Sequence, residues 1–484
     1  MRIAMVASEC EPFAKTGGLA DVVDALARAL GRAGHEIDVY LPRYRVLHGR
    51  PAELMAVTVS VPVGVEPGSP DPVRRIPVTV RSGAADGYRI RFVEHDPSFH
   101  RDGYYGGPDG DYPDNALRFT LLGRAALETI RAEARPVDVL HGHDWQAGPA
   151  LLSIDARYRF DPLLARTATV LTCHNLAYHG WVPRDRAWAL DLPDDVGDRH
   201  GVDLLREAVR GADIVNTVSP TYARESLTLA FGAGLDDVLA ERGDRYGGIL
   251  NGLDTRLWDP ARDAALAATY SLADLSGKAT CRADLAARHR LDPDGPILGL
   301  VGRLDPQKGF DLVTAAAPDL VADGARLIVL GTGDERLLGD LRVLAARHPR
   351  RVVLLDRFDR DEARRIYAGA DLFLMPSRFE PSGQGQLIAL RYGTVPVVRR
   401  TGGLADTIRD ADADPAAGNG FVFDAEEPEA FADAVRRAIV ALADPVRRGT
   451  LLRNGMSADP SWAGPAARYA ALYRRATELR AGLR

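Results

Sequence analysis

Short apolar runs alternate with longer amphipathic stretches along most of the chain. Residues 2–7 (RIAMVA) have the pattern of a strand buried on both faces, and a helical pattern follows from about Leu19 to Arg32. Gly34 ends that helix, and the next apolar run, EIDVYLP, predicts a second strand. This succession is typical of a βαβ unit in a parallel sheet. The sequence lacks G-x-G-x-x-G here, so it does not indicate a dinucleotide fingerprint.

The alternation is interrupted once and then restarts. From about 51 to 100 the pattern changes to alternating strands, which predicts a hairpin-rich insertion. A polar, glycine-rich loop follows with Tyr104, Tyr105 and Tyr112, for which stacking on sugar rings and ordinary loop exposure are equally open. Glycines cluster at 246–254, and the strand–helix pattern begins again at 296. We therefore expect an α/β protein of two halves, with a hinge near 248.

Length and composition exclude several classes of protein. A chain of 484 residues is too long for one core, and 46% hydrophobic with 26% charged residues is ordinary for a globular protein. The net charge of −6 leaves no basic footprint for nucleic acid. Three widely spaced cysteines (10, 173 and 281) form neither a disulfide framework nor a zinc pattern, and no apolar run is long enough for a membrane span. We expect a soluble cytoplasmic protein.

Polar side chains stand at the ends of two predicted strands. VDVLHGHDW places His141, His143 and Asp144 at one strand end, and ATVLTCHN places His174 at another. Ligands of α/β sheets bind at this edge. The His-x-His-Asp run has no third or fourth metal ligand nearby in sequence, so we expect no metal. Asp144 is better interpreted as a carboxylate lining a sugar pocket.

Cations and glycines mark two further loops. Lysine occurs only at positions 15, 278 and 308, and the other basic residues are arginines. Lys15 precedes Gly17 and Gly18 after the first strand, where glycines let backbone N–H groups approach a diphosphate. Arg303 and Lys308 follow the strand at 296–302. Two fixed cations at a strand end suit a diphosphate leaving group, although solvated loop charges are the commoner case.

The stretch from Met375 to Asp406 combines a strand end, a glycine turn and a helix. The turn holds Glu380 ahead of Ser382, Gly383, Gln384 and Gly385, and a helix starting near Gly385 directs free N–H groups at the turn, as a phosphate requires. The hexapeptide TGGLAD at 401–406 also occurs at 16–21. This repetition suggests two similar halves that face one site.

Eight motifs, in order, resemble those of bacterial glycogen synthases and plant starch synthases. They are KTGGLADV, HDWQAG, CHNLAYHG, TVSPTYARE, GILNGLD, GRLDPQKGFDL, PSRFEPSGQGQL and VRRTGGLADT. They span nearly the whole chain, and the closing SW…A..Y..LY helix fits the same pattern.

The resemblance implies a GT-B fold, with two Rossmann-like domains facing a central cleft. The expected domains are an N-terminal Rossmann-like domain over 1–247, a nucleotide-sugar-binding domain over 248–459, and a C-terminal helix over 460–484 that crosses back to the first domain. The implied reaction transfers glucose from ADP-glucose to the non-reducing end of an α-1,4-glucan. It retains the anomeric configuration and uses no metal or other cofactor. A front-face and a covalent route to retention both remain open.

The resemblance also implies roles for individual residues. Arg303 and Lys308 hold the diphosphate, and Glu380 and His174 hold the transferred glucose. Asp144 lies near the anomeric centre. The donor-binding residues are Lys15, Gly17, Gly18, Asn251, Ser382, Gly383, Gln384 and Gly385.

One departure from the family pattern keeps alternatives open. Family members commonly read E-P-C-G-L-T-Q in the phosphate turn, whereas this chain has Ser382, Gln384 and Gly385 at the changed positions. A retaining glucosyltransferase that uses UDP-glucose or another acceptor is therefore the main alternative. A catalytically silent glucan-binding paralogue and a sugar-nucleotide epimerase are the others. Acceptor length, oligomeric state and regulation have no signal in the sequence.

Overall fold

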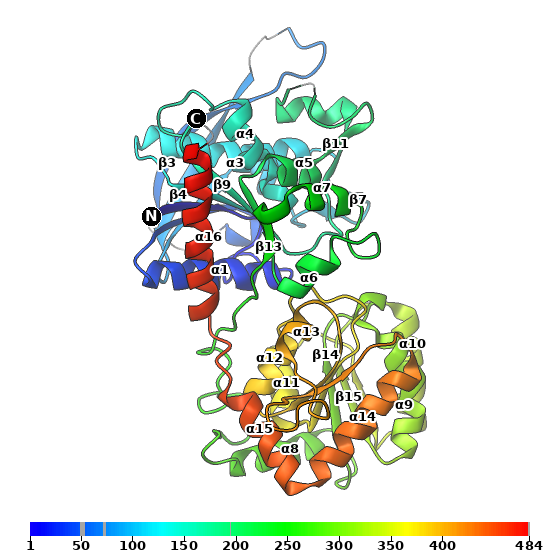
Figure 1. Ribbon diagram of the computed structural model, residues 1–484. Helices are drawn as coiled ribbons and strands as arrows, with labels where there is room; N and C mark the ends of the chain where they lie inside the picture. The colour runs from blue at the N-terminus through cyan, green and yellow to red at the C-terminus, as the bar shows by residue number, and fades with distance from the viewer. Residues whose placement is uncertain (49–53, 71–73, 194, 483–484) are drawn as a thin grey trace. The chain divides into compact units, whose positions relative to one another are not determined.

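The computed structural model describes residues 1–48, 54–70, 74–193 and 195–482 (Figure 1). The chain divides into two compact units. Unit 1 comprises residues 1–218, 223–252 and those from 462 onward, and unit 2 comprises residues 219–222 and 253–461. The chain thus leaves unit 1, builds unit 2, and returns to unit 1 with its last helix.

Unit 1 is built on a nine-stranded sheet in the order β13-β12-β9-β8-β1-β2-β5-β4-β3. All neighbours are parallel except β3–β4 and β4–β5. The hairpin expected in the interrupted region therefore extends the main sheet at one edge. The strands are β1 (Arg2–Val6), β2 (Glu36–Pro42), β3 (Met55–Val63), β4 (Arg74–Ala84), β5 (Arg89–Glu94), β8 (Val139–His143), β9 (Ala168–Cys173), β12 (Ile214–Thr217) and β13 (Tyr246–Gly248).

Helices cover both faces of this sheet. Helix α3 packs on the strands and on α4, and α4 packs on α5, whereas α1 packs on β2 and on α16. The helices are α1 (Gly18–Arg32), α2 (Asp96–Phe99), α3 (Asn115–Ala132), α4 (Gly148–Ala156), α5 (Leu204–Gly211), α6 (Pro220–Glu225, which the unit division crosses), α7 (Asp236–Glu241) and α16 (Ala463–Gly482). The final helix, red in Figure 1, lies against β8, β9 and α1. Residues 483 and 484 of the expected helix lie outside the described residues.

Shorter elements complete unit 1. They are the 3₁₀ turns η1 (Arg45–Leu47), η2 (Trp145–Ala147), η3 (Arg184–Leu190) and η4 (Gly243–Arg245), and the two-stranded pairs β6 (Gly106–Gly107) with β7 (Gly110–Asp111) and β10 (Trp181–Pro183) with β11 (Gly201–Asp203).

Unit 2 has a six-stranded, wholly parallel sheet in the order β16-β15-β14-β17-β18-β19. Counted from its own first strand, this is the 3-2-1-4-5-6 order of a doubly wound fold. The strands are β14 (Ile297–Val301), β15 (Arg326–Leu330), β16 (Val352–Leu355), β17 (Leu372–Met375), β18 (Val395–Arg399) and β19 (Phe421–Phe423). The helices are α8 (Ser276–Arg288), α9 (Phe310–Ala322), α10 (Glu335–Arg347), α11 (Arg360–Gly369), α12 (Gly385–Arg391), α13 (Gly402–Thr407), α14 (Pro428–Ala443) and α15 (Pro445–Ser457), with the 3₁₀ turn η5 (Pro306–Lys308).

Alternating strand residues build two apolar layers in unit 2. Leu327 and Val329 point into a core formed with α9, α10 and α14, whereas Ile328 and Leu330 point into a core formed with α8, α11 and α12. Successive side chains of a strand face opposite sides, so a run without polar residues has to be covered twice. This explains why the sequence shows continuous apolar runs and no alternation here.

Candidate functional site

The candidate residues follow the strands at which the chain order of each sheet reverses. In unit 1 the reversal lies between β1 and β8, and in unit 2 it lies between β14 and β17. Ligands of open α/β sheets bind outside the carboxyl ends of the strands at this switch point. Lys15 and Asp144 follow β1 and β8, Lys308 follows β14, and Glu380 follows β17. His174 follows β9, the neighbour of β8.

In unit 1, the turn after β1 is organised by Glu9. Its carboxylate accepts hydrogen bonds from Thr16 N at 2.5 Å, Thr16 Oγ1 at 2.6 Å and Gly17 N at 3.2 Å. The Tyr105 hydroxyl donates to the same carboxylate at 2.5 Å. Glu9 therefore joins the glycine turn to the polar loop that carries Tyr105. The sequence gives it no role, because only its position directly after β1 marks it.

Lys15 lies in the exposed part of that turn. Its Nζ donates to Asp21 Oδ1 at 2.5 Å and lies 3.6 Å from Glu11 Oε2. A Cβ added at Gly17 or Gly18 would meet nothing within 4 Å, so the backbone at the start of α1 is open to approach. The turn thus holds the cation that the sequence predicts, whereas the Gly17 N–H is donated to Glu9.

Asp144 has an unusual backbone and an unusual environment. Its φ of 56° and ψ of −174° lie outside the regions that non-glycine residues favour, a strain that functional sites often hold. Its carboxylate accepts a hydrogen bond from His174 N at 2.6 Å. Burial raises the pKa of Asp144 to about 7, and nearby Glu9 raises it further, although backbone hydrogen bonds oppose the shift. Asp144 and His174 thus meet at one strand edge, as expected.

Three neutral histidines lie side by side beneath this edge. His143 Nδ1 lies 3.0 Å from His174 Nε2, and the ring centroids of His141 and His143 are 4.1 Å apart. Burial lowers the pKa of both His141 and His174 to about 3, and the pKa of His143 also falls well below its ordinary value. His174 is therefore an uncharged hydrogen-bonding group at neutral pH. It is partly exposed, whereas His141 and His143 are fully buried.

Asn251 lies just beyond β13, near the end of the 223–252 segment of unit 1. It is 8% exposed, and its Oδ1 is buried with no hydrogen-bond partner among the described residues. A buried amide oxygen without a partner costs free energy unless a ligand or water satisfies it. This is consistent with the expected role in ligand contact.

In unit 2, Lys308 and Glu380 form a direct ion pair. Lys308 Nζ lies 2.7 Å from Glu380 Oε2, and the Ser377 hydroxyl donates to the same oxygen at 3.1 Å. Glu380 is 6% exposed. The Arg303 side chain is 64% exposed, and its guanidinium lies 3.5 Å from Asp305 Oδ2. The structure therefore brings Lys308 and Glu380 together and leaves Arg303 facing solvent. Ser377 is a further site residue that the sequence does not single out.

The two loops that carry this pair are joined to each other. Arg378 forms two hydrogen bonds of 2.7 Å with the Asp311 carboxylate, and Arg378 N donates to Gln307 O at 2.8 Å. A Cβ at Gly309 would lie 2.0 Å from Pro376 O, so only glycine permits this approach. The loop after β14 and the loop after β17 therefore form one rigid support for Lys308 and Glu380.

The turn from Ser382 to Gly385 leads into α12. Ser382 Oγ is buried and has no partner in the described part of the chain, and Gly383 has a φ of +68° that favours glycine. A Cβ at Gly385 would lie 3.0 Å from the Phe373 ring, so a side chain at this position would be crowded. Gln384 is the residue before α12 and makes no side-chain cap.

The three tyrosines of the polar loop are engaged within unit 1. Tyr104 stacks on Tyr44 with ring centroids 4.2 Å apart, and Tyr105 bonds to Glu9. The Tyr112 ring lies 4.7 Å from the guanidinium of Arg101. Their rings therefore serve internal packing in this structure.

A surface hollow of about 470 Å³ lies elsewhere in unit 1. It is lined by residues 34–37 and 87–89, at the amino-terminal ends of β2 and β5. The candidate residues follow the carboxyl ends of the strands, so this hollow is separate from them.

Comparison with known proteins agrees with this arrangement. Residues 2–241 match the family described as "Starch synthase catalytic domain", and residues 282–442 match "Glycosyl transferases group 1". The chain is 42% identical to a glycogen synthase of Syntrophotalea carbinolica, with 99% of each chain covered. It is 45% identical to a glycogen synthase of Anaeromyxobacter dehalogenans, with 98% of this chain and 99% of that protein covered.

A solved structure extends the comparison to three dimensions. The catalytic domain of starch synthase IV from Arabidopsis thaliana, bound to ADP and acarbose, is 31% identical with a TM-score of 0.87, covering 98% of this chain and 99% of that one. The chain has two doubly wound units with polar groups at their switch points. Together with this likeness, they define a glycosyltransferase of GT-B fold. The expected fold class is confirmed. The chain belongs to the family of glycogen and starch synthases, and the resemblance seen in its motifs is confirmed.

Proposed function

We propose that this protein is a glycogen synthase that transfers glucose from ADP-glucose to the non-reducing end of an α-1,4-glucan, with retention at the anomeric carbon. The observation that carries the proposal is the Lys308–Glu380 pair at the switch point of unit 2, 2.7 Å apart. This pair stands on a chain whose relatives of 42% and 45% identity are glycogen synthases over their full length.

The groups in unit 2 suit the departing nucleotide. As the bond between glucose and the diphosphate breaks, negative charge grows on the diphosphate, and fixed cations stabilise that charge. We assign this role to Lys308 and Arg303. Ser382 Oγ, buried without a partner among the described residues, supplies a further donor in the glycine turn with Gly383, Gln384 and Gly385. Glu380 accepts hydrogen bonds from the hydroxyls of the transferred glucose.

The groups in unit 1 suit the sugar. His174 is neutral at pH 7 because burial lowers its pKa to about 3, so it exchanges hydrogen bonds with a sugar hydroxyl without adding charge. Asn251 Oδ1 is an acceptor that lacks a partner in the described chain. Lys15 presents a cation to the donor, and the backbone at Gly17 and Gly18 is open to its close approach. These residues provide the transition state with charge and hydrogen bonds, and we propose that no metal takes part.

The route to retention follows from the environment of Asp144. A covalent intermediate needs an ionised carboxylate at the anomeric carbon. Burial raises the pKa of Asp144 to about 7, so a large share of this group carries a proton at neutral pH. We therefore favour departure and attack on the same face of the sugar, with Asp144 as a polar neighbour of the anomeric centre.

The test compares sugar nucleotides. The purified chain is incubated with glycogen and either ADP-glucose or UDP-glucose, and release of ADP or UDP is measured together with incorporation of glucose. We expect turnover with ADP-glucose and at least tenfold lower kcat/KM with UDP-glucose. Preference for UDP-glucose would show that UDP-glucose, and not ADP-glucose, is the donor. Glycogen binding without release of either nucleotide would indicate a catalytically silent glucan-binding protein.

Localisation and partners follow from the same proposal. We place the activity in the cytoplasm, where the three cysteines, all free and buried, remain reduced. None of the helices in the described residues has the length and apolar character needed to cross a bilayer. The partners are ADP-glucose and a maltooligosaccharide or glycogen chain.

A further inference from the structure

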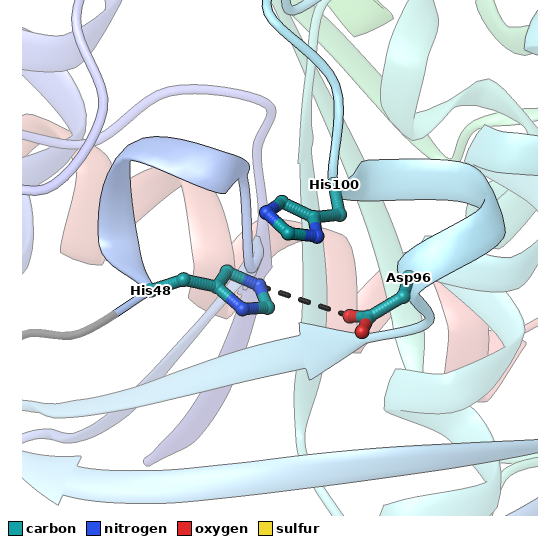
Figure 2. A group of neighbouring side chains, drawn as sticks. All are labelled: His48, Asp96 and His100. Carbon is teal, nitrogen blue, oxygen red and sulfur yellow. Dashed lines mark ion pairs between the residues drawn. The ribbon is translucent and has the colours of Figure 1, made fainter.

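Two histidines and a carboxylate gather in unit 1, apart from the residues assigned above. His48 directly follows η1 (Arg45–Leu47), whereas Asp96 and His100 lie one helical turn apart at the two ends of α2 (Figure 2). His48 Nε2 lies 3.8 Å from Asp96 Oδ1, and one ligand atom from each residue falls within 4.8 Å of the others. The chain thus brings together residues that are about fifty positions apart.

The cluster is held in place by buried neighbours. Leu47 and Phe99, each next to one of the histidines, are 4% and 0% exposed. Phe99 packs edge-on against Tyr44, with ring centroids 6.3 Å apart. The two segments therefore have a fixed separation, and the polar side chains project from a rigid base.

The polar atoms of the cluster are incompletely satisfied. His48 Nε2 is buried and has no hydrogen-bond partner among the described residues, since Asp96 at 3.8 Å is too distant for a hydrogen bond. The rings of His48 and His100 are stacked, with centroids 4.3 Å apart and planes within 4°. Two imidazoles and a carboxylate thus face one another without a proton-sharing contact that explains their convergence.

We propose that His48, Asp96 and His100 bind a divalent transition-metal ion, with Zn²⁺ as the best match. Two imidazoles and a carboxylate form a mixed nitrogen and oxygen donor set that suits zinc, with water in the remaining position. Ligand atoms of a tetrahedral zinc ion lie about 3.3 Å apart, because the bonds are about 2.0–2.1 Å long. The 3.8 Å between His48 Nε2 and Asp96 Oδ1 is close to this value.

Binding requires one movement. A ligating imidazole keeps the metal in the plane of its ring, so two parallel stacked rings cannot direct their lone pairs at one ion. His100 is exposed, and its ring must rotate out of the stack for its nitrogen to share an ion with the other two groups. Because α2 fixes the spacing of Asp96 and His100, the backbone need not change.

The bound ion would join η1 to α2. The segment after His100 leads to Tyr104, which stacks on Tyr44, and to Tyr105, which donates to Glu9. The metal therefore adds a cross-link at the base of the loop that supports the glycine turn. This inference does not depend on the proposed function, because it concerns metal affinity and stability.

The test measures metal binding directly on the full chain. Protein treated with a chelator and then desalted is titrated with Co²⁺, whose absorption bands report the donor set, and with Zn²⁺ in competition with a chromophoric chelator. We expect one ion per chain with a Kd below about 10 µM, and a melting temperature that rises with Zn²⁺ concentration. His48→Ala and His100→Ala should each weaken binding at least tenfold, and Asp96→Asn should weaken it while preserving side-chain shape.

A matched control removes another exposed histidine of unit 1. His200→Ala changes a residue outside the cluster and should leave the Co²⁺ spectrum and the Zn²⁺ affinity unchanged. Circular dichroism checks that each variant is folded. Absence of binding in the wild-type chain at 100 µM Zn²⁺, or equal affinity in wild type and all three cluster variants, would overturn the proposal.

Discussion

At the scale of single residues, the charges of the candidate site are already paired before a donor arrives. Lys308 Nζ is 2.7 Å from Glu380, and Lys15 Nζ is 2.5 Å from Asp21. A diphosphate that approaches Lys308 competes for its ammonium group with the carboxylate of Glu380, a residue that is 6% exposed. The pair therefore compensates a buried carboxylate. Under the proposed function, a sugar that donates hydroxyl hydrogen bonds to Glu380 would release the ammonium for phosphate.

Removal of either diphosphate cation should slow the chemical step. We expect Lys308→Ala and Arg303→Ala to lower kcat with ADP-glucose by about two orders of magnitude, because such charges act mainly on the transition state. Steady-state kinetics with glycogen as acceptor measures the effect. Arg336→Ala is the control for Arg303, since these side chains are 65% and 64% exposed, and it should leave kcat unchanged. Near-normal kcat in both site variants would contradict the diphosphate assignment.

Asp144 predicts a specific dependence of stability on pH. Burial raises its pKa from 3.8 to about 7, so the folded protein holds this proton more tightly than the unfolded chain. The contribution of this carboxyl to stability is therefore present at low pH and is lost as pH rises from about 4 to about 7. Asp144→Asn removes the titration and still accepts the hydrogen bond from His174 N.

The expected result is a pH-dependent gain in the variant. The melting temperature of Asp144→Asn minus that of wild type should increase between pH 5 and pH 8. Thermal unfolding in matched buffers gives both values. Asp244→Asn alters a carboxylate whose side chain is 84% exposed in the same unit, and it should show no such trend. A difference that stays constant with pH would exclude a raised pKa at Asp144.

At the scale of elements, strand β17 packs beneath Gly385, one of the residues at which this chain differs from the family pattern of the phosphate turn. Gly385 begins α12, and a Cβ there would lie 3.0 Å from Phe373 Cε1 and 3.3 Å from both Met375 Sδ and Tyr367 Oη. The first two belong to β17, so the strand below fills the space that a larger residue would occupy. A larger residue at this position would therefore require these neighbours to shift by a few tenths of an ångström.

Substitution at Gly385 should therefore destabilise the protein. We expect Gly385→Ala to lower the free energy of unfolding by about 1 kcal/mol, because crowding in a packed layer outweighs the gain in helix propensity. Gly339→Ala is a matched control, since this glycine lies inside α10 with nothing within 4 Å of an added Cβ, and it should stabilise by about 0.5–1 kcal/mol. Chemical denaturation measures both. Equal stabilisation by the two changes would refute the packing argument.

The elements were predictable from the sequence where their signals are local. Apolar runs and glycines mark the strands and turns that carry Lys15, Asp144 and Lys308, because parallel strands are buried on both faces. The roles of Glu9 and Ser377 were not predictable, since each depends on hydrogen bonds to loops placed by the fold. The same holds for His48 and His100, which approach only because β2 and β5 are neighbours.

At the scale of the whole molecule, the path of the chain makes unit 1 depend on its last helix. The chain builds unit 2 between Gly252 and Trp462, and α16 then returns to pack on β8, β9 and α1. Unit 1 is therefore complete only when α16 is in place. The strand edge that carries Asp144 and His174 belongs to the strands that α16 covers.

A buried chain of hydrogen bonds connects two turns of α16 to these strands. Tyr473 OH lies 2.8 Å from His141 Nδ1, and His141 Nε2 lies 2.7 Å from Thr172 Oγ1. Thr172 in turn donates to Asn216 Oδ1 at 2.8 Å, and Asn216 Nδ2 donates to Tyr469 OH at 3.2 Å. Because Thr172 gives its only hydroxyl proton to Asn216, its oxygen accepts from His141 Nε2, and Nδ1 of the neutral ring then accepts from Tyr473 OH. Within this chain, His141 lies beside His143, the partner of His174.

Tyr473→Phe should break this chain at one end and leave His141 Nδ1 buried without a donor. We expect a loss of about 1–3 kcal/mol in the free energy of unfolding, since an unsatisfied buried acceptor bears its full desolvation cost. Calorimetry on the full chain measures the loss, and Tyr178→Phe, at a tyrosine that is 57% exposed, should cost far less. Because Tyr473 is fully buried and is not one of the proposed site residues, the kcat of the folded variant should fall much less than that of Lys308→Ala. Unchanged stability in Tyr473→Phe would show that α16 is held by apolar contacts alone.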